Sequence, residues 1–203
     1  MSTVSRTVQA YDDCAPGYRE WRWNSLWDDV EVPAVVDHLR AAGSVVDLGC
    51  GYGRYAGACA ERSVRYCGVD ASAGMLGLAA GRRGSFVHAD LAQYRSSVPA
   101  DVVLSTRVLS NLEAPDSLME AVDRNLRPGG TFVITDFHER YQFRRQTIKG
   151  RYQRDVVVPV FRHSAERVRG AIRRAGLTLR HERTLSFDDG RSLLSLYSGT
   201  KPA

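Results

Sequence analysis

The sequence has few of the features that would place it in a membrane, in an oxidising compartment or on a metal ion. It contains no run of about 18 or more apolar residues, and its N-terminal segment has no apolar core of the kind a secretion signal needs. The four cysteines show no C-x-x-C spacing, so we expect reduced thiols and no metal site. We therefore expect a cytoplasmic protein without a membrane partner.

Lysine is also scarce, because Lys149 and Lys201 are the only two lysines and arginine supplies the rest of the positive charge. The net charge is +5, but a genome-composition bias explains the arginine preference as well as function does. The positive charge alone therefore does not indicate that the protein binds nucleic acid. With 203 residues, of which 43% are hydrophobic, the chain is long enough for one well-buried domain and short for two. We expect a single domain over residues 1–203.

Glycine is concentrated directly after a short apolar run, in the stretch SVVDLGCGYGR at residues 44–54. The apolar run predicts a buried strand, and the three glycines, at alternate positions, predict a tight turn into a helix. A dinucleotide-binding loop spaces its glycines differently, and Asp47, two residues before the first glycine, would repel a pyrophosphate. The loop therefore favours a cationic, amine-bearing nucleoside such as S-adenosylmethionine. A purely structural turn is the alternative.

Two more acids follow the next two predicted strands. The strand over residues 65–69 ends in Asp70, which can accept hydrogen bonds from both hydroxyls of a ribose. A short strand over residues 85–88 precedes Asp90 and Leu91, which are suited to an adenine amino group and ring. Each acid alone could be a helix N-cap. Three acids at the ends of three successive strands favour a nucleoside site.

These motifs resemble those of the class I S-adenosylmethionine-dependent methyltransferases. The similarity covers the glycine loop and the segments at residues 68–72, 89–91, 100–106 and 126–130. It implies an α/β fold: a doubly wound, mostly parallel seven-stranded sheet with an antiparallel C-terminal hairpin, an N-terminal helical cap and a lid hairpin inserted after the fifth strand. It also implies an enzyme that uses S-adenosylmethionine and releases S-adenosylhomocysteine, but it says almost nothing about the acceptor. Transfer to O or N of a small molecule, with an anionic or aromatic acceptor preferred, is our interpretation.

By this resemblance, the cofactor-binding candidates lie in the cap, in the glycine loop and at the ends of the following strands. They are Tyr18, Asp47, Gly49, Cys50, Gly51, Gly53, Asp70, Ala71, Met75, Asp90, Leu91 and Thr106. For Met75, contact with the cofactor and packing in the hydrophobic core are equally good interpretations.

The N-terminal region, residues 1–32, predicts an aromatic cap. We expect residues 1–10 to form a loosely docked arm and a helix to begin at Pro33. The segment from Tyr11 to Tyr18 resembles the opening of many small-molecule methyltransferases, which makes both tyrosines pocket candidates. We expect the tryptophans of the region to pack in the core.

Three residues are catalytic candidates. His138 follows the fifth predicted strand and has a side chain that titrates near neutrality, although a structural histidine is the alternative. Tyr11 and Arg107 are the others, with Arg107 in a loop that should face the transfer site. A base matters for a hydroxyl or a protonated amine and is unnecessary for a carboxylate or phosphonate.

Residues 139–163 predict a lid that carries several arginines, and its substrate-binding candidates are Arg144, Arg145 and His163. The basic hairpin fits a solvated face, a clamp on an acceptor with a carboxylate, phosphate or phosphonate, or an RNA surface. A small-molecule methyltransferase, monomeric or homodimeric, is our interpretation. An RNA methyltransferase and a non-catalytic S-adenosylmethionine-binding protein are the alternatives.

Overall fold

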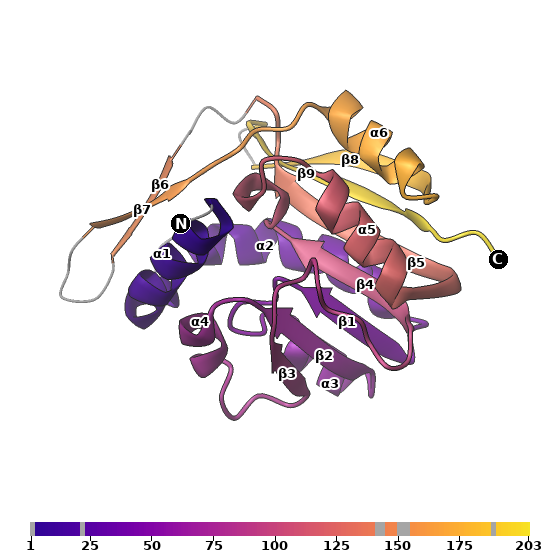
Figure 1. Cartoon of the computed structure of the whole chain (residues 1–203), viewed down its shortest axis with the longest axis horizontal. Helices are drawn as coiled ribbons and strands as arrows, with labels where there is room; N and C mark the ends of the chain where they lie inside the picture. The colour runs from indigo at the N-terminus through magenta and orange to yellow at the C-terminus, as the bar shows by residue number, and fades with distance from the viewer. Residues whose placement is uncertain (1–2, 21–22, 141–144, 150–154, 188–189) are drawn as a thin grey trace.

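A seven-stranded sheet forms the middle of the protein in this computed structural model, which describes residues 3–20, 23–140, 145–149, 155–187 and 190–203 (Figure 1). The strand order is β3-β2-β1-β4-β5-β9-β8. The strands are β1 (Ser44–Leu48), β2 (Arg65–Asp70), β3 (Ser85–His88), β4 (Ala100–Thr106), β5 (Leu126–Phe137), β8 (Thr178–Ser186) and β9 (Ser192–Thr200).

The first five strands pair in parallel, whereas β9 runs antiparallel to both β5 and β8. This arrangement confirms the predicted mostly parallel sheet with an antiparallel C-terminal hairpin. The helices are α1 (Thr3–Tyr18), α2 (Trp23–Val36), α3 (Ala56–Glu61), α4 (Ala73–Gly77), α5 (Asp116–Asn125) and α6 (Ala165–Arg174), with short 3₁₀ turns η1 (Asp37–Leu39) and η2 (Leu109–Asn111).

Two hydrophobic cores cover the two faces of the sheet. One joins α2 and α3 to the sheet and includes Trp27, Val35, Ala56, Val45 and Val133. The other joins α5 and α6 to the sheet and includes Met119, Val122, Ile172, Val46 and Ile134. Adjacent residues of one strand, such as Val45 and Val46, belong to different cores because successive side chains of a strand point to opposite faces. The apolar run in β1 is therefore buried on both sides, as in other parallel sheets.

The N-terminal region differs from the sequence prediction in two places. The expected arm at residues 1–10 is helical from Thr3, because the buried side chains of Cys14 and Tyr18 pack α1 against Met75. The helix expected from Pro33 instead begins at Trp23 and contains Pro33 in its interior. Residues on both sides of this proline, Trp27 and Val35, are buried in one core, so tertiary packing keeps the helix continuous.

The lid region contains a two-stranded antiparallel sheet of β6 (Arg145–Lys149) and β7 (Asp155–Pro159). Val158 of β7 is buried in the same small cluster as Cys14 and Tyr18 of α1, so the hairpin packs on the N-terminal helix (Figure 1). The predicted hairpin is thus confirmed for the strands that the structure describes. Residues 150–154 of its turn lie outside the described residues.

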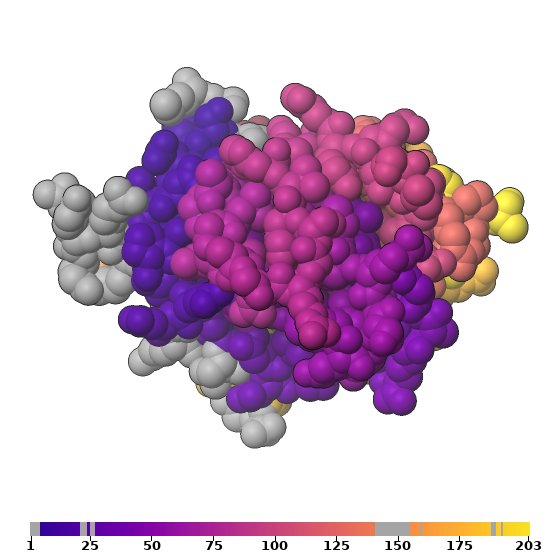
Figure 2. All heavy atoms as spheres, turned by 90° about the horizontal axis from the view of Figure 1, so that it is seen from below, coloured from indigo at the N-terminus to yellow at the C-terminus, as the bar shows by residue number. Residues whose placement is uncertain are grey.

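On the face shown in Figure 2, α1 (indigo) lies beside the magenta segment that begins with α4. Asp12 of α1 ties the two together, since its carboxylate accepts hydrogen bonds from the Ser72 hydroxyl at 2.6 Å and from the Gly74 amide at 2.8 Å. Over the ranges that the structure covers, none of the helices is both long and apolar enough to cross a bilayer.

Candidate active site

A cavity of about 300 Å³ is lined by the segments that follow β1, β2 and β4 and by one side of α1. In open α/β sheets, ligands bind at the carboxyl ends of the strands, where the strand order reverses. Here β1 is the first strand in the chain, with β2 on one side and β4 on the other. The cavity therefore occupies the position at which such a sheet binds its ligand.

The glycine loop forms one wall of this cavity. Gly49 and Gly51 line it, with backbone φ angles of +76° and +54° that L side chains rarely adopt. A Cβ atom on Gly49 would lie 2.3 Å from Cγ2 of Val108. The loop is therefore a bare turn of backbone against which a ligand can lie. Gly53, by contrast, does not line the cavity, and its Cβ would lie 2.7 Å from the ring of Phe86, so glycine here serves packing.

Asp70, at the end of β2, joins the glycine loop to the next turn. Its carboxylate oxygens accept hydrogen bonds from the amide of Gly51 at 2.7 Å and from the amide of Ser72 at 2.8 Å. Burial raises the pKa of Asp70, and these two hydrogen bonds oppose that rise. Asp70 also lines the cavity.

Most of the other cofactor candidates surround the same cavity. Its lining includes Tyr18, Cys50, Ala71, Met75, Asp90, Leu91 and Thr106. Met75 is 3% exposed and also packs against α1, so it serves as cavity wall and as core.

Asp47 requires a correction, because it lies in the interior and does not line the cavity. The hydroxyl of Tyr66 donates a hydrogen bond to its carboxylate at 2.6 Å. Burial raises the pKa of Asp47 to about 7. Its position therefore does not support a direct contact with an ammonium group of the ligand, one of the two modes of contact, direct or through a water, that the sequence suggests.

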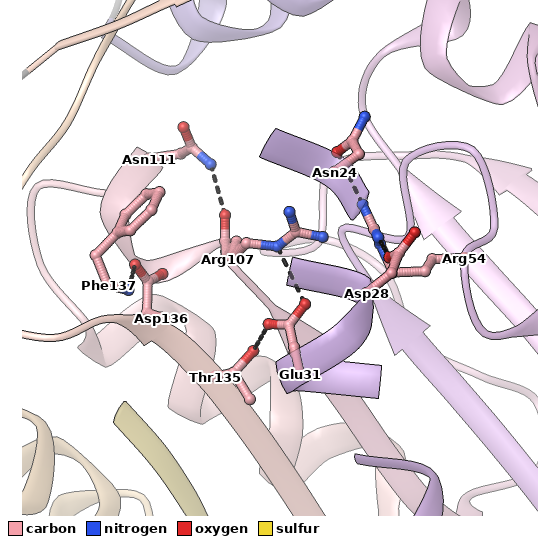
Figure 3. A network of polar contacts seen from close by, with 9 residues as sticks. All are labelled: Asn24, Asp28, Glu31, Arg54, Arg107, Asn111, Thr135, Asp136 and Phe137. Atoms are coloured by element: carbon pink, nitrogen blue, oxygen red, sulfur yellow. Dashed lines mark hydrogen bonds and ion pairs between the residues drawn. The ribbon is translucent and has the colours of Figure 1, made fainter. Parts of the chain in front are cut away.

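Arg107 and Glu31 form a buried ion pair next to the cavity (Figure 3). Nε of Arg107 lies 3.3 Å from Oε2 of Glu31, whose side chain is fully buried. The hydroxyl of Thr135 donates to the other Glu31 oxygen, and Cζ of Arg107 lies 4.4 Å from the ring centroid of Trp27. Burial opposes the charge on Arg107, but Glu31 and the nearby tyrosines outweigh it and raise its pKa above the ordinary value. Arg107 lines the cavity, as predicted.

Sequence reasoning missed Glu31. The signal was present, because Trp27, Glu31 and Val35 are spaced at four residues and share the buried face of α2. An acid on such a face needs a buried cation as its partner. The expected helix start at Pro33 left Glu31 outside any helix, so this pattern was not visible.

Arg54 is a second arginine on the cavity wall that the sequence prediction did not include. It forms an ion pair with Asp28, and its Nη2 donates to the side-chain oxygen of Asn24 at 3.0 Å (Figure 3). Its Cζ also lies 5.1 Å from the ring centroid of Tyr52. Burial lowers the pKa of Arg54 to about 9, and the positive charge of Arg107 adds to this effect.

Three tyrosines, Tyr11, Tyr18 and Tyr52, line the remaining wall. The ring centroid of Tyr18 lies 6.0 Å from that of Tyr11 and 6.0 Å from that of Tyr52. Tyr11 donates a hydrogen bond to the side-chain oxygen of Asn111 at 3.4 Å. Burial raises the pKa of all three phenols, so they are hydrogen-bond donors near neutral pH.

His138 lies away from this cavity, contrary to its predicted position on the acceptor side. Its backbone amide donates to the carbonyl of Leu193 at 3.1 Å, which extends the pairing of β5 with β9. The residue therefore lines a separate surface hollow beside Arg169 and Glu182. Because the chain directly after β5 continues to pair with β9, it leads away from the cavity at His138. The position of His138 therefore does not support its role as the catalytic base.

Of the three predicted substrate-binding residues, the structure describes the side chain of His163, which is not among the residues that line the cavity. Nε2 of His163 lies 3.0 Å from the carbonyl oxygen of Leu109 and 2.9 Å from that of Leu112, so the ring holds the η2 turn in place. Arg144 lies outside the described residues, and for Arg145 the structure describes only the backbone, in β6.

The strand order, the bare glycine loop and the acid at the end of β2 define a Rossmann-like nucleoside-binding enzyme fold. A family model described as a methyltransferase domain matches residues 19–182. The chain therefore belongs to this family, the class I S-adenosylmethionine-dependent methyltransferases.

Among curated proteins, trans-aconitate 2-methyltransferase of Azoarcus sp. (strain BH72) is 37% identical over 100 residues. The match covers 47% of this chain and spans only 40% of the length of that relative. Similar solved structures include the CcbJ methyltransferase of Streptomyces caelestis, with a TM-score of 0.77, 22% identity and coverage of 96% of this chain and 98% of that one. S-adenosylmethionine-bound CalS10, an amino pentose methyltransferase from Micromonospora echinaspora, has a TM-score of 0.67 at 21% identity and coverage of 86% and 92%. These structures share the fold.

Proposed function

We propose that the protein transfers the methyl group of S-adenosylmethionine to an oxygen or nitrogen of a small molecule that carries a carboxylate. One observation carries the proposal: a single cavity joins the glycine loop and Asp70 to a wall that contains Arg107. The first part suits a nucleoside and the second suits an anion, so cofactor and acceptor would meet in one chamber.

The cofactor side of the cavity fits S-adenosylmethionine by its residues. Asp70 would hold the ribose hydroxyls, and Asp90 with Leu91 would hold the adenine. The left-handed glycines Gly49 and Gly51 let the backbone make the tight turn that lines the nucleoside side of the cavity. When bound, the cofactor supplies a methyl group on a positively charged sulfur.

The acceptor side offers hydrogen-bond donors and a positive charge. Arg107 is charged, and the phenols of Tyr11 and Tyr18 are protonated near neutral pH because burial raises their pKa. Such groups bind and orient an anion rather than remove a proton. A carboxylate is already an anion, so its methylation needs no base. The chain would contribute mainly by aligning the reactants and excluding water, which is worth roughly 7–11 kcal/mol in favourable cases.

The partial relative from Azoarcus sp. supports this acceptor class, because the name trans-aconitate 2-methyltransferase specifies a carboxylate-bearing acceptor. The similarity spans less than half of that protein, so it supports the class and not the particular acid. An aromatic or aliphatic acid with one or more carboxylates is the acceptor that we expect.

The test is a turnover screen with the purified chain and S-adenosylmethionine. Carboxylic acids, phenols and amines are offered in turn, and S-adenosylhomocysteine and the methylated product are measured by mass spectrometry. We expect product with at least one carboxylate-bearing compound. Tight cofactor binding with no product across the screen would favour a non-catalytic binding protein. Methyl incorporation into RNA but into none of the small molecules would favour the RNA alternative.

A further inference from the structure

We propose that Arg107 binds the carboxylate of the acceptor through the part of its guanidinium group that Glu31 does not engage. This inference rests on the proposed function and makes it specific, because it assigns recognition of the acceptor to one side chain. Three features of Arg107 support it: how the side chain is held, which of its donors remain free and what surrounds them.

Arg107 is held in one orientation by two side chains of α2, one of which is itself held by β5. Glu31 of α2 pairs with its Nε at 3.3 Å, and the Trp27 ring lies 4.4 Å from its Cζ. Thr135 of β5 donates to Glu31 and so fixes the carboxylate as well. A guanidinium group that is already immobile loses little conformational entropy when it binds a ligand. This arrangement therefore favours recognition over a purely structural pair.

The terminal nitrogens of Arg107 point away from the Glu31 carboxylate (Figure 3). Nη1 is buried, and within the part of the chain that the structure describes it has no hydrogen-bond partner. A buried guanidinium donor without a partner costs free energy, and an anion in the adjoining cavity would remove that cost. Because Arg107 lines this cavity, a bound ligand can reach it.

Arg54, the other arginine on the cavity wall, is already engaged. Its guanidinium pairs with Asp28, donates to Asn24 and lies against the ring of Tyr52. Its charge would help to attract an anion into the cavity, but its donors serve the protein itself. Arg107 is therefore the better candidate for direct contact.

The surroundings of Arg107 favour a carboxylate over a phosphate. One free edge of a guanidinium group matches the two oxygens of one carboxylate in a planar, two-bond geometry. The cavity that Arg107 lines is walled by three tyrosines and by apolar side chains such as Val8, Val108 and Leu112, together with polar residues such as Asn111. A phosphate carries more charge and needs more donors. A carboxylate attached to an apolar body fits this wall, and the position of Arg107 directly after β4 places its side chain in the cavity that the glycine loop also lines.

The experiment is a ligand-observed NMR titration of the chain saturated with S-adenosylhomocysteine. The probes are benzoate, phenylacetate and trans-aconitate, with benzamide and phenylacetamide as neutral partners of similar shape. We expect at least one carboxylate to bind about tenfold more tightly than its neutral partner, and the Arg107→Met variant to lose this preference. Arg107→Lys should retain part of it, because a lysine keeps the charge but not the two-bond geometry.

Two further variants separate recognition from folding. Arg107→Met combined with Glu31→Gln removes both buried charges, so a folded protein remains available if Arg107→Met alone is unstable. Arg40→Met serves as the control, since the Arg40 side chain is 80% exposed and pairs with nearby Asp37 at the surface. All variants are compared by their affinity for S-adenosylhomocysteine, which should stay unchanged.

Several outcomes would overturn the inference. Equal binding of the carboxylates by wild type and by the double variant would show that Arg107 is not the contact. A parallel loss of S-adenosylhomocysteine affinity would assign Arg107 to the cofactor. Turnover of neutral acceptors with no binding of any carboxylate would refute the inference and leave the proposed methyl transfer intact. Failure to bind S-adenosylhomocysteine at all would refute the proposed function itself, and the inference with it.

Discussion

The side chain of Glu31 is fully buried, and its Oε2 lies 3.3 Å from Nε of Arg107, so an ion pair joins α2 to the end of β4. Glu31→Ala would leave the buried guanidinium without its counter-charge. We expect the free energy of unfolding to fall by about 3–5 kcal/mol, measured by urea denaturation. The exposed pair of Arg40 and Asp37 provides the control, because Asp37→Ala should cost only about 0–1 kcal/mol. An equal decrease in the free energy of unfolding in the two variants would mean that the buried pair stabilises the protein no more than the exposed pair does.

The glycine loop leads to a prediction about one added methyl group. Gly49→Ala places a Cβ 2.3 Å from Cγ2 of Val108 and forces alanine into a φ of +76°. We expect weaker binding of S-adenosylhomocysteine and lower stability, by calorimetry and by urea denaturation. Combining Gly49→Ala with Val108→Ala should recover only part of the lost stability. The second substitution removes the steric contact, but the backbone strain of about 1–2 kcal/mol remains.

Gly57 in α3 offers the matched control for that substitution. A Cβ on Gly57 would meet no atom within 4 Å, and its φ is not in the left-handed region. Gly57→Ala should therefore leave cofactor binding unchanged and raise stability by about 0.4–1 kcal/mol. If Gly49→Ala behaved like Gly57→Ala, the loop would not be the close backbone approach that we describe.

Asp70 tests the location of the nucleoside site. Its carboxylate orders the glycine loop through the Gly51 amide and lies on the cavity wall. We expect Asp70→Ala to raise the dissociation constant of S-adenosylhomocysteine about tenfold or more, measured by isothermal titration calorimetry. Asp123→Ala, which removes a surface pair with Lys201, should leave it unchanged. An unaltered constant for Asp70→Ala, with circular dichroism like that of wild type, would place the nucleoside elsewhere.

Much of the fold could be predicted from local patterns in the sequence. The apolar residues of β1 and the alternate glycines are adjacent in the chain, and the glycines adopt positive φ angles. Asp70, the acid that ends β2, follows Gly53 by 17 residues. Ser164 is a local signal of the same kind, because its hydroxyl accepts a hydrogen bond from the Arg167 amide and caps α6. Because features of this kind depend mainly on nearby residues, the sequence was sufficient to predict most of the residues that line the cavity at the glycine loop and at the ends of β2 and β3.

The acceptor side could not be predicted in the same way, because it depends on contacts between distant segments. Glu31 and Arg107 are 76 positions apart and meet only because α2 packs across the sheet. His138 is correctly placed after β5, but the direction of its side chain depends on pairing with β9, which comes about 55 residues later in the chain. Strand position alone does not fix the direction of a side chain beyond the end of the strand.

The last prediction concerns Asp47 and the dependence of stability on pH. Burial raises the pKa of this carboxyl from 3.8 to about 7 in the folded protein. A raised pKa means that the folded state holds a proton that the unfolded state has lost, so the stabilisation is fully present below about pH 4 and is lost as the pH rises through about 7. Asp47→Asn cannot ionise and escapes this loss.

We therefore expect the stability of Asp47→Asn, relative to wild type, to increase between about pH 4 and pH 8 by at most about 4 kcal/mol, measured by urea denaturation at several pH values. Asp101→Asn is the control. Its hydrogen bond from Arg127 lowers the pKa of Asp101, so this carboxylate is ionised in both states above about pH 5 and the difference from wild type should stay constant there. A constant difference for Asp47→Asn as well would show that Asp47 is ionised in the folded protein. In that case the hydrogen bond from Tyr66 would outweigh the effect of burial.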